Sequence, residues 1–298
     1  MSPELTLLLQ LVVGGVAIGG VYSLIALGFV LIYKATDVLN LAHGELLLVG
    51  AYVSYALIAQ VGLPLPVALL GTFAFAIVLG LAIERLALRP LIGEPVISVI
   101  MVTIGLAILL RALVVLVWGS EYRVYPQVLP AESLHLGPVT IGQEFVWSFV
   151  IATTLVALFG ALFRYTKMGI AMRAVADDQQ AALSMGINVR AVFATSWVVA
   201  ALVASVGGML LASIQGVGVL LATLGLKALP VAIVGGLDSI IGAAVGGIIV
   251  GVLETLSAGY LDIPLGGGVR DVVPFVFLVV VLLLKPHGLF GKPRIERV

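Results

Sequence analysis

The sequence contains no cysteine and few charged residues. Without cysteine the chain cannot form disulfides or metal-thiolate sites, and thiol chemistry is excluded. Charged residues make up only 10% of the 298 positions, whereas soluble domains carry about 25%. The formal net charge is zero, so the charge balance gives no indication of a nucleic-acid partner.

Apolar residues are abundant instead. They fill 62% of the chain, and the mean hydropathy is +1.26. A helix needs about 20 mostly apolar residues to cross a bilayer, and we find nine candidate windows: 8–33, 46–59, 66–84, 96–118, 145–163, 191–214, 220–235, 240–258 and 272–284. We therefore predict an all-α polytopic membrane protein with about 8–10 transmembrane helices. It should fold as a single transmembrane domain, residues 1–298.

The ends of these windows indicate the orientation. The N-terminal segment has no basic residues before its apolar run, so we expect a retained span and not a cleaved signal peptide. Positive residues favour the cytoplasmic side. If the N-terminus lies outside, eleven basic residues fall on the cytoplasmic side and two on the outer side. They are Lys34, Arg85, Arg89, Arg164, Lys167, Arg173, Arg190, Lys285, Lys292, Arg294 and Arg297.

One cytoplasmic stretch, residues 164–190, is too polar for lipid: RYTKMGIAMRAVADDQQAALSMGINVR. Gly169 and Gly186 bracket residues that favour one short helix, with Arg173 and Asp177 at i,i+4 spacing. A small-residue face, Ala181, Ala182 and Met185, suits insertion into a groove on another protein. The alternative is a solvated amphipathic connector.

Two polar breaks interrupt the apolar windows. The first contains Asp37, Asn40, His43 and Glu45. Ionisable groups at membrane depth are costly and tend to mark pathways, so this break is predicted to line or gate a route. The alternative is an ordinary turn in which Asp37 or Asn40 caps the next helix. The small residues nearby are expected to allow close helix packing; they are Gly44, Gly50 and Ala51.

The second break is Gly235-Gly236-Leu237-Asp238-Ser239. Gly236 and Asp238 are candidate gate residues, although Asp238 could also be the N-cap of the helix that follows. Within that helix, Gly242, Gly246, Gly247 and Gly251 follow small-xxx-small spacing, which favours tight helix contact. Two cations fall inside windows, Lys227 and Arg111, and Glu254 is a possible partner for either.

Motifs for catalysis are missing. The phosphate-binding pattern G-x-x-x-x-G-K-[ST] does not occur, so the chain is not expected to hydrolyse ATP. The sequence also lacks an arrangement typical of a catalytic triad, a metal-ligand cluster or an H-E-x-x-H pair. We predict no catalytic residue, no metal site and no cofactor.

Four segments together resemble a known family. The order D-x-x-A-A-x-x-x-G-I, from Asp178 to Ile187, resembles the EAA-type loop of ABC importer permeases, with Asp178 where the general pattern has Glu. The segment around it and three others, GFVLIYKATDVLNLAHGELLLVGAY, VAIVGGLDSIIGAAVGGIIVGVLE and LLLKPHGLFGKP, are similar to branched-chain amino acid permeases of the LivH type, in the hydrophobic amino acid uptake family.

This resemblance implies the permease subunit of an ABC importer for branched-chain or other small hydrophobic amino acids, working by alternating access in the bacterial inner membrane. The implied partners are a homologous permease, more readily a paralogue than an identical copy, cytoplasmic ATPase subunits and a periplasmic binding protein. The implied ATPase-coupling residues are Gly169, Met172, Arg173, Asp177, Asp178, Ala181, Ala182, Gly186 and Ile187. Three alternatives remain: a urea or short-amide permease of the same family, an ion-coupled secondary transporter, and a passive channel.

Overall fold

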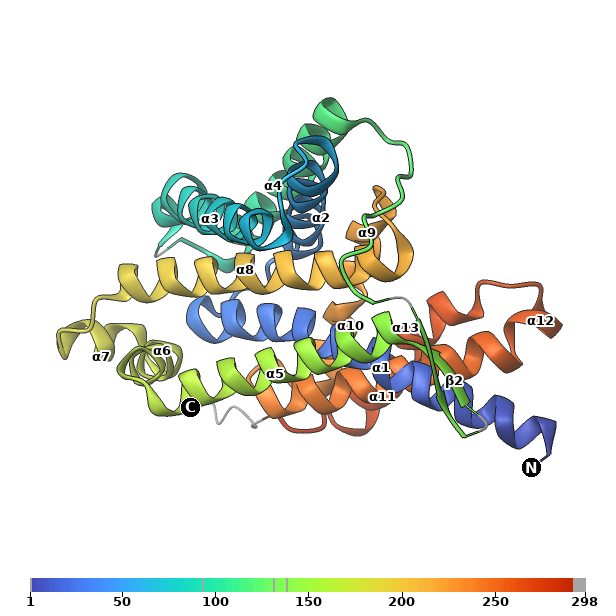
Figure 1. Ribbon diagram of the computed structural model, residues 1–298. Coiled ribbons are helices and arrows are strands. Elements are labelled where there is room, and N and C mark those ends of the chain that lie inside the picture. The colour runs from blue at the N-terminus through green and yellow to red at the C-terminus, as the bar shows by residue number, and fades with distance from the viewer. Residues whose placement is uncertain (1, 93, 131, 138, 292–298) are drawn as a thin grey trace. The chain divides into compact units, whose positions relative to one another are not determined.

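The computed structural model describes residues 2–92, 94–130, 132–137 and 139–291, and its chain is mostly helical (Figure 1). Lys292, Arg294 and Arg297, three of the predicted cytoplasmic cations, lie outside these residues. The chain forms two compact units that interleave in sequence. Unit 1 comprises Met1–Val30, Leu129–Val156 and Lys227–Val298, and unit 2 comprises Leu31–Val128 and Ala157–Leu226.

Six helical stretches in the described residues are long and apolar enough to cross a membrane. They are α1 (Pro3–Thr36), α3 with its continuation (Leu65–Leu91), α4 (Val96–Trp118), α5 (Gln143–Tyr165), α8 (Val189–Gln215) and α11 (Ile240–Tyr260). The continuation of α3 consists of η2 (Glu84–Leu88) and η3 (Arg89–Leu91). Each stretch contains one of the windows predicted from sequence, which confirms the all-α polytopic fold.

The other three windows form shorter helices. Window 46–59 lies in α2 (His43–Tyr55), which continues as the π-helix η1 (Ala56–Gln60). Window 220–235 is divided at Lys227 into α9 (Leu220–Leu226) and α10 (Ala228–Gly235). The last window forms α13 (Val269–Leu284), which follows the short α12 (Asp262–Leu265).

The core of unit 2 is built around α2. This helix is buried on nearly every side and packs against α8, α4 and α9. Close approach depends on glycine: a Cβ on Gly50 would lie 2.5 Å from the Ser205 hydroxyl, and one on Gly225 would lie 2.9 Å from the Gly44 Cα. The predicted role of Gly44 and Gly50 in close packing is confirmed.

In unit 1, α11 packs against α1 through facing glycines. A Cβ on Gly251 would lie 2.5 Å from the Gly15 carbonyl oxygen, and one on Gly19 would lie 2.6 Å from the Gly247 carbonyl oxygen. The Ser23 hydroxyl donates to the Ala244 carbonyl oxygen over 2.7 Å and so joins the two helices. The predicted tight contact of the Gly-rich helix is confirmed.

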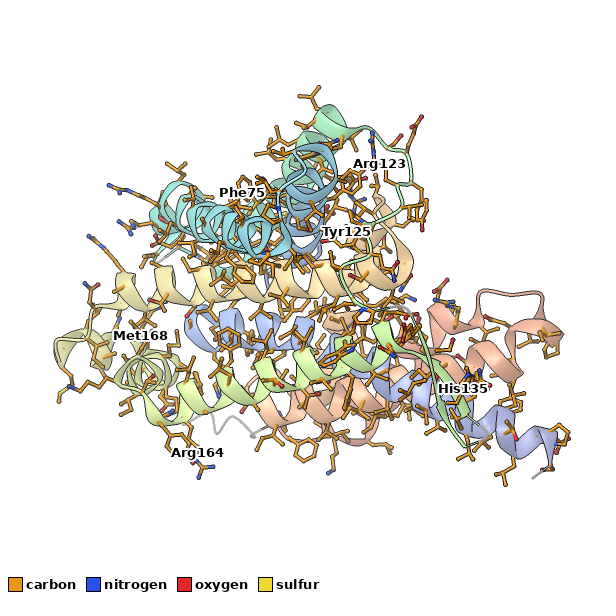
Figure 2. All side chains as sticks on the ribbon, viewed as in Figure 1. Phe75, Arg123, Tyr125, His135, Arg164 and Met168 are labelled. Carbon is orange, nitrogen blue, oxygen red and sulfur yellow. The ribbon has the colours of Figure 1, made fainter. Side chains whose placement is uncertain are left out.

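The segment between α4 and α5 contains structure that the sequence did not predict. β1 (Ser133–Leu136) and β2 (Val139–Gly142) form an antiparallel hairpin in unit 1. Earlier in the same segment, within unit 2, the Tyr125 hydroxyl lies 2.8 Å from the Ser54 hydroxyl of α2 (Figure 2). The strands are only four residues long, too short for alternation of polar and apolar residues to be recognised.

Candidate functional site

The polar segment 164–190 folds as two helices, not as the single helix expected. They are α6 (Lys167–Asp177) and α7 (Gln179–Ser184), which follow α5 in unit 2 (Figure 1). The break falls at Asp178, whose backbone is extended at φ −158°. Its carboxylate accepts hydrogen bonds from the backbone amides of Gln180 and Ala181, at 2.8 and 2.9 Å. Asp178 is thus the N-cap of α7, because a cap requires a non-helical residue with a side-chain acceptor.

One side of this segment is buried within the chain. Met172 of α6 is 6% exposed and Ala182 of α7 is 3% exposed, and both helices contact α8. Gly169 is buried too, where a side chain would collide with the backbone of Phe163. These residues hold the segment to the rest of unit 2, so the predicted small-residue face is divided: Ala182 points inward, whereas Ala181 and Met185 are exposed.

Arg173 anchors α6 to the end of α5. Its guanidinium donates to the Phe163 carbonyl oxygen and lies 5.4 Å from the centre of the Phe163 ring. The Lys34 ammonium lies over the same ring at 4.8 Å. Although Arg173 and Asp177 stand at i,i+4 spacing, they form no ion pair in the described part of the chain, because the guanidinium is directed to the Phe163 carbonyl oxygen.

The opposite side of the segment is apolar and exposed. Ile170, Leu183 and Met185 are 55%, 58% and 82% exposed. Met168 is 38% exposed, and the Arg164 side chain at the end of α5 points away from the helices (Figure 2). Sequence reasoning did not single out Ile170 or Leu183. The helical spacing of these residues could have predicted the exposure of Ile170. Met172 and Val175 form the buried face of α6, and Ile170 cannot lie on that same face.

The remaining coupling residues lie at the ends of the two helices. Asp177 is the exposed last residue of α6. Gly186 follows α7 with φ 81°, a conformation that glycine adopts without strain. The half-buried Ile187 donates its amide to the Ala182 carbonyl oxygen over 3.0 Å. Gly186 and Ile187 therefore determine the direction of the chain after α7.

The first predicted break lies between α1 and α2 in unit 2. Asp37 directly follows α1 and has φ 57°, the one described non-glycine residue with a positive φ. Asn40 is 1% exposed, and its Oδ1 accepts a hydrogen bond from the Ala42 amide at 3.0 Å. Its Nδ2 has no hydrogen-bond partner among the described residues. The N-cap of α2 is Ala42, so neither Asp37 nor Asn40 caps that helix directly.

His43 and Glu45 are buried in the first turn of α2. Glu45 forms an ion pair with Arg111 of α4, with Nε at 2.9 Å from Oε1. The second carboxylate oxygen of Glu45 is buried without a hydrogen-bond partner in the described part of the chain. Of the two partners considered for Glu254, Arg111 is therefore wrong, since Arg111 pairs with Glu45.

The second break lies between α10 and α11 in unit 1. Ser239, not Asp238, is the N-cap of α11, and its hydroxyl accepts from the Gly242 amide at 2.9 Å. Gly236 has φ 106° and lies against the C-terminal segment. There the Leu289 amide donates to the Val234 carbonyl oxygen over 2.8 Å. The capping alternative for Asp238 is thus wrong, because the neighbouring hydroxyl satisfies that amide.

A buried ionic cluster lies elsewhere in unit 1. The Lys227 ammonium lies 2.9 Å from Glu254 of α11 and 2.6 Å from Asp271 of α13. Lys227 and Glu254 are 5% and 4% exposed. Tyr22 of α1 is buried against the same Glu254 carboxylate. The suggested pairing of Lys227 with Glu254 is confirmed.

Comparison with known proteins identifies relatives over the whole chain. The chain is 35% identical to the high-affinity branched-chain amino acid transport system permease protein LivH of Salmonella typhimurium, with both chains fully covered. It is 34% identical to the corresponding protein BraD of Pseudomonas aeruginosa, over 99% of this chain and 100% of that one. The probable permease protein LivH of Methanocaldococcus jannaschii is 32% identical, over 93% and 91%.

A family profile described as branched-chain amino acid transport system, permease component, matches residues 11–282. That range contains both polar breaks, the two helices α6 and α7, the pair of Glu45 with Arg111, and the ionic cluster around Lys227. The chain therefore belongs to the family of branched-chain amino acid transport system permease components.

Proposed function

We propose that this chain is the membrane-spanning subunit of an ABC importer for branched-chain or other small hydrophobic amino acids. Its partners would be a homologous permease, a pair of cytoplasmic ATPase subunits and a binding protein on the outer side of a bacterial inner membrane. Family membership supports the reaction class. The exposed apolar side of α6 and α7, in a segment whose flanking charges favour the cytoplasm, is the structural observation that carries the proposal.

The two sides of this segment would have different roles in coupling. Met172 and Ala182 fix it to the chain, whereas Ile170, Leu183 and Met185 present an apolar surface suited to a groove on the ATPase. Because Arg173 binds the end of α5, a displacement of α6 by the partner would be transmitted to that helix. ATP binding and hydrolysis on the partner would in this way open the translocation route to the two sides of the membrane in turn.

The route itself would be lined or gated by the two breaks. Asp37, Asn40, His43 and Glu45 supply the first, and Gly236 and Asp238 supply the second. Asn40 and Glu45 each keep a buried polar atom without a hydrogen-bond partner among the described residues. Such groups normally have partners, and a passing zwitterionic solute would provide hydrogen-bond donors and acceptors.

The energy source can be tested in vesicles that contain this chain with its candidate partners. With ATP supplied inside and all ion gradients collapsed by ionophores, uptake of labelled leucine should continue at its full rate. Loss of uptake under these conditions would indicate an ion-coupled transporter. Uptake without ATP or partners would indicate a channel. Labelled urea, offered with its own binding protein, tests the short-amide alternative.

The docking surface predicts the effect of exposed substitutions. Leu183→Asp and Met185→Asp should each lower co-purification of the ATPase subunits at least tenfold, because a charge would have to be buried at the interface. Both side chains are exposed in this chain, so membrane insertion should be unchanged. Ser184→Asp, at an exposed position between them, is the matched control for added charge. Undiminished co-purification of both variants would exclude this surface.

A further inference from the structure

A cavity of about 200 Å³ lies within unit 2, beside the break that contains Asn40. Its volume is several times the roughly 30 Å³ that a water molecule occupies in the liquid. Its lining comes from the end of α1, the segment around η3, the start of α4, the first residue of α7 and the start of α8. The charge distribution favours the cytoplasmic side for these ends.

The walls of the cavity are mostly apolar and include Leu88, Phe193 and Trp197. These three side chains are 7%, 7% and 2% exposed. Thr36 and Thr103 also line the cavity, but their hydroxyls already donate to the carbonyl oxygens of Ile32 and Ile100. The hydrophobic part of the site therefore suits a small aliphatic group, whose burial is favourable by about 25 cal/mol per Å².

Three further polar side chains line the cavity. Glu94 is exposed and supplies a carboxylate, Gln179 supplies an amide, and Asn40 is 1% exposed with an Nδ2 that has no partner among the described residues. A buried donor without a partner costs roughly 1–3 kcal/mol, so an acceptor on a ligand would be favoured there. The set of an acid, amide donors and an apolar wall matches an amino acid with an aliphatic side chain.

We propose that this cavity is a cytoplasmic binding site for free aliphatic amino acids, with the ammonium at Glu94, the carboxylate at Asn40 and the side chain against Leu88, Phe193 and Trp197. The site is separate from the ATPase-docking surface, but it shares Asn40 with the first break. Gln179 connects it to the docking surface, since Gln179 begins α7. A ligand held between Glu94 and Gln179 would restrain α7. This inference rests on the proposed function. If the chain imports amino acids, amino acid that accumulates in the cytoplasm would bind here and slow further import.

Binding can be measured on the full chain in lipid nanodiscs without any partner. Trp197 lines the cavity, so its fluorescence reports occupancy in a background with Trp118→Phe and Trp147→Phe. L-leucine should give a saturable signal. 4-Methylpentanoate, which lacks the ammonium, and isoamylamine, which lacks the carboxylate, should each bind at least tenfold more weakly. Equal binding of all three would overturn the assigned orientation.

Glu94→Gln is the test variant, because it keeps the size of the side chain and removes its charge. It should raise the dissociation constant for leucine at least tenfold. The dissociation constants of leucine and 4-methylpentanoate should then become similar. Glu121→Gln, an exposed acid between α4 and the hairpin, is the matched control and should bind as the unmodified chain does. Leucine binding that is absent from the unmodified chain, or unchanged in Glu94→Gln, would overturn the site.

The regulatory step is tested with the assembled transporter in vesicles whose interior corresponds to the cytoplasm. Preloading with unlabelled leucine should lower the initial rate of labelled uptake at least threefold, and Glu94→Gln should abolish this inhibition. If uptake is normal and preloading has no effect, the inference about regulation fails while the proposed function stands. If ATP-driven uptake is absent, the proposed function fails, while leucine binding in nanodiscs still decides the site.

Discussion

Gly15→Ala is expected to lower the free energy of unfolding by about 3 kcal/mol, through one added methyl group. Its Cβ would lie 2.6 Å from the Val252 Cα and 3.0 Å from the Gly251 carbonyl oxygen. These are backbone atoms of α11, so the clash cannot be relieved by changing a side-chain rotamer. The two helices would have to move apart and would lose the close contact along their glycines.

The adjacent residue provides the control. A Cβ on Gly14, in the same helix, would meet nothing within 4 Å. Alanine is favoured over glycine in a helix by about 1 kcal/mol, so Gly14→Ala should leave stability unchanged or raise it slightly. Thermal unfolding in detergent, followed by the loss of the monodisperse peak in size-exclusion chromatography, compares the two. Equal midpoints for Gly14→Ala and Gly15→Ala would mean that α1 and α11 do not pack through these glycines.

Lys227→Met should be the most damaging change to the charged residues, with a loss of about 3–5 kcal/mol in the free energy of unfolding. The substitution leaves Glu254, which is 4% exposed, without the ammonium that lies 2.9 Å away. Arg270 compensates only in part, because its Nε is 3.8 Å from the same carboxylate. A buried carboxylate without a close counter-charge is strongly disfavoured.

A double-mutant cycle separates the ion pair from simple loss of packing. Adding Glu254→Gln to Lys227→Met removes the uncompensated charge, and it should recover most of the lost stability. The measurement is the yield and unfolding midpoint of the single and double variants in the same detergent. If the double variant is as unstable as the sum of the two single variants, the pair contributes no coupling energy, and the prediction is wrong.

Some features of the candidate site could be predicted because they depend on local composition. Residues 164–190 stand out by polarity alone, and the glycines at four-residue spacing in α11 predict a close helix contact whatever the partner. The division of that segment at Asp178 could not be predicted in the same way. Aspartate is tolerated in a helix interior at modest cost and is also a favoured N-cap. The packing of both α6 and α7 against α8 selected the N-cap position for Asp178.

The sequence by itself determined that this protein lies in a membrane and which residues must be small, since these follow from hydropathy and spacing along one chain. It also predicted, from the positions of the basic residues, that the polar segment lies on the cytoplasmic side. Only the tertiary structure decided that Glu45 pairs with Arg111 and Glu254 with Lys227. It also decided that Ala182 is buried while Leu183 is exposed. The physical reason is that burial and pairing depend on helices far apart in sequence, whose facing residues no local pattern specifies.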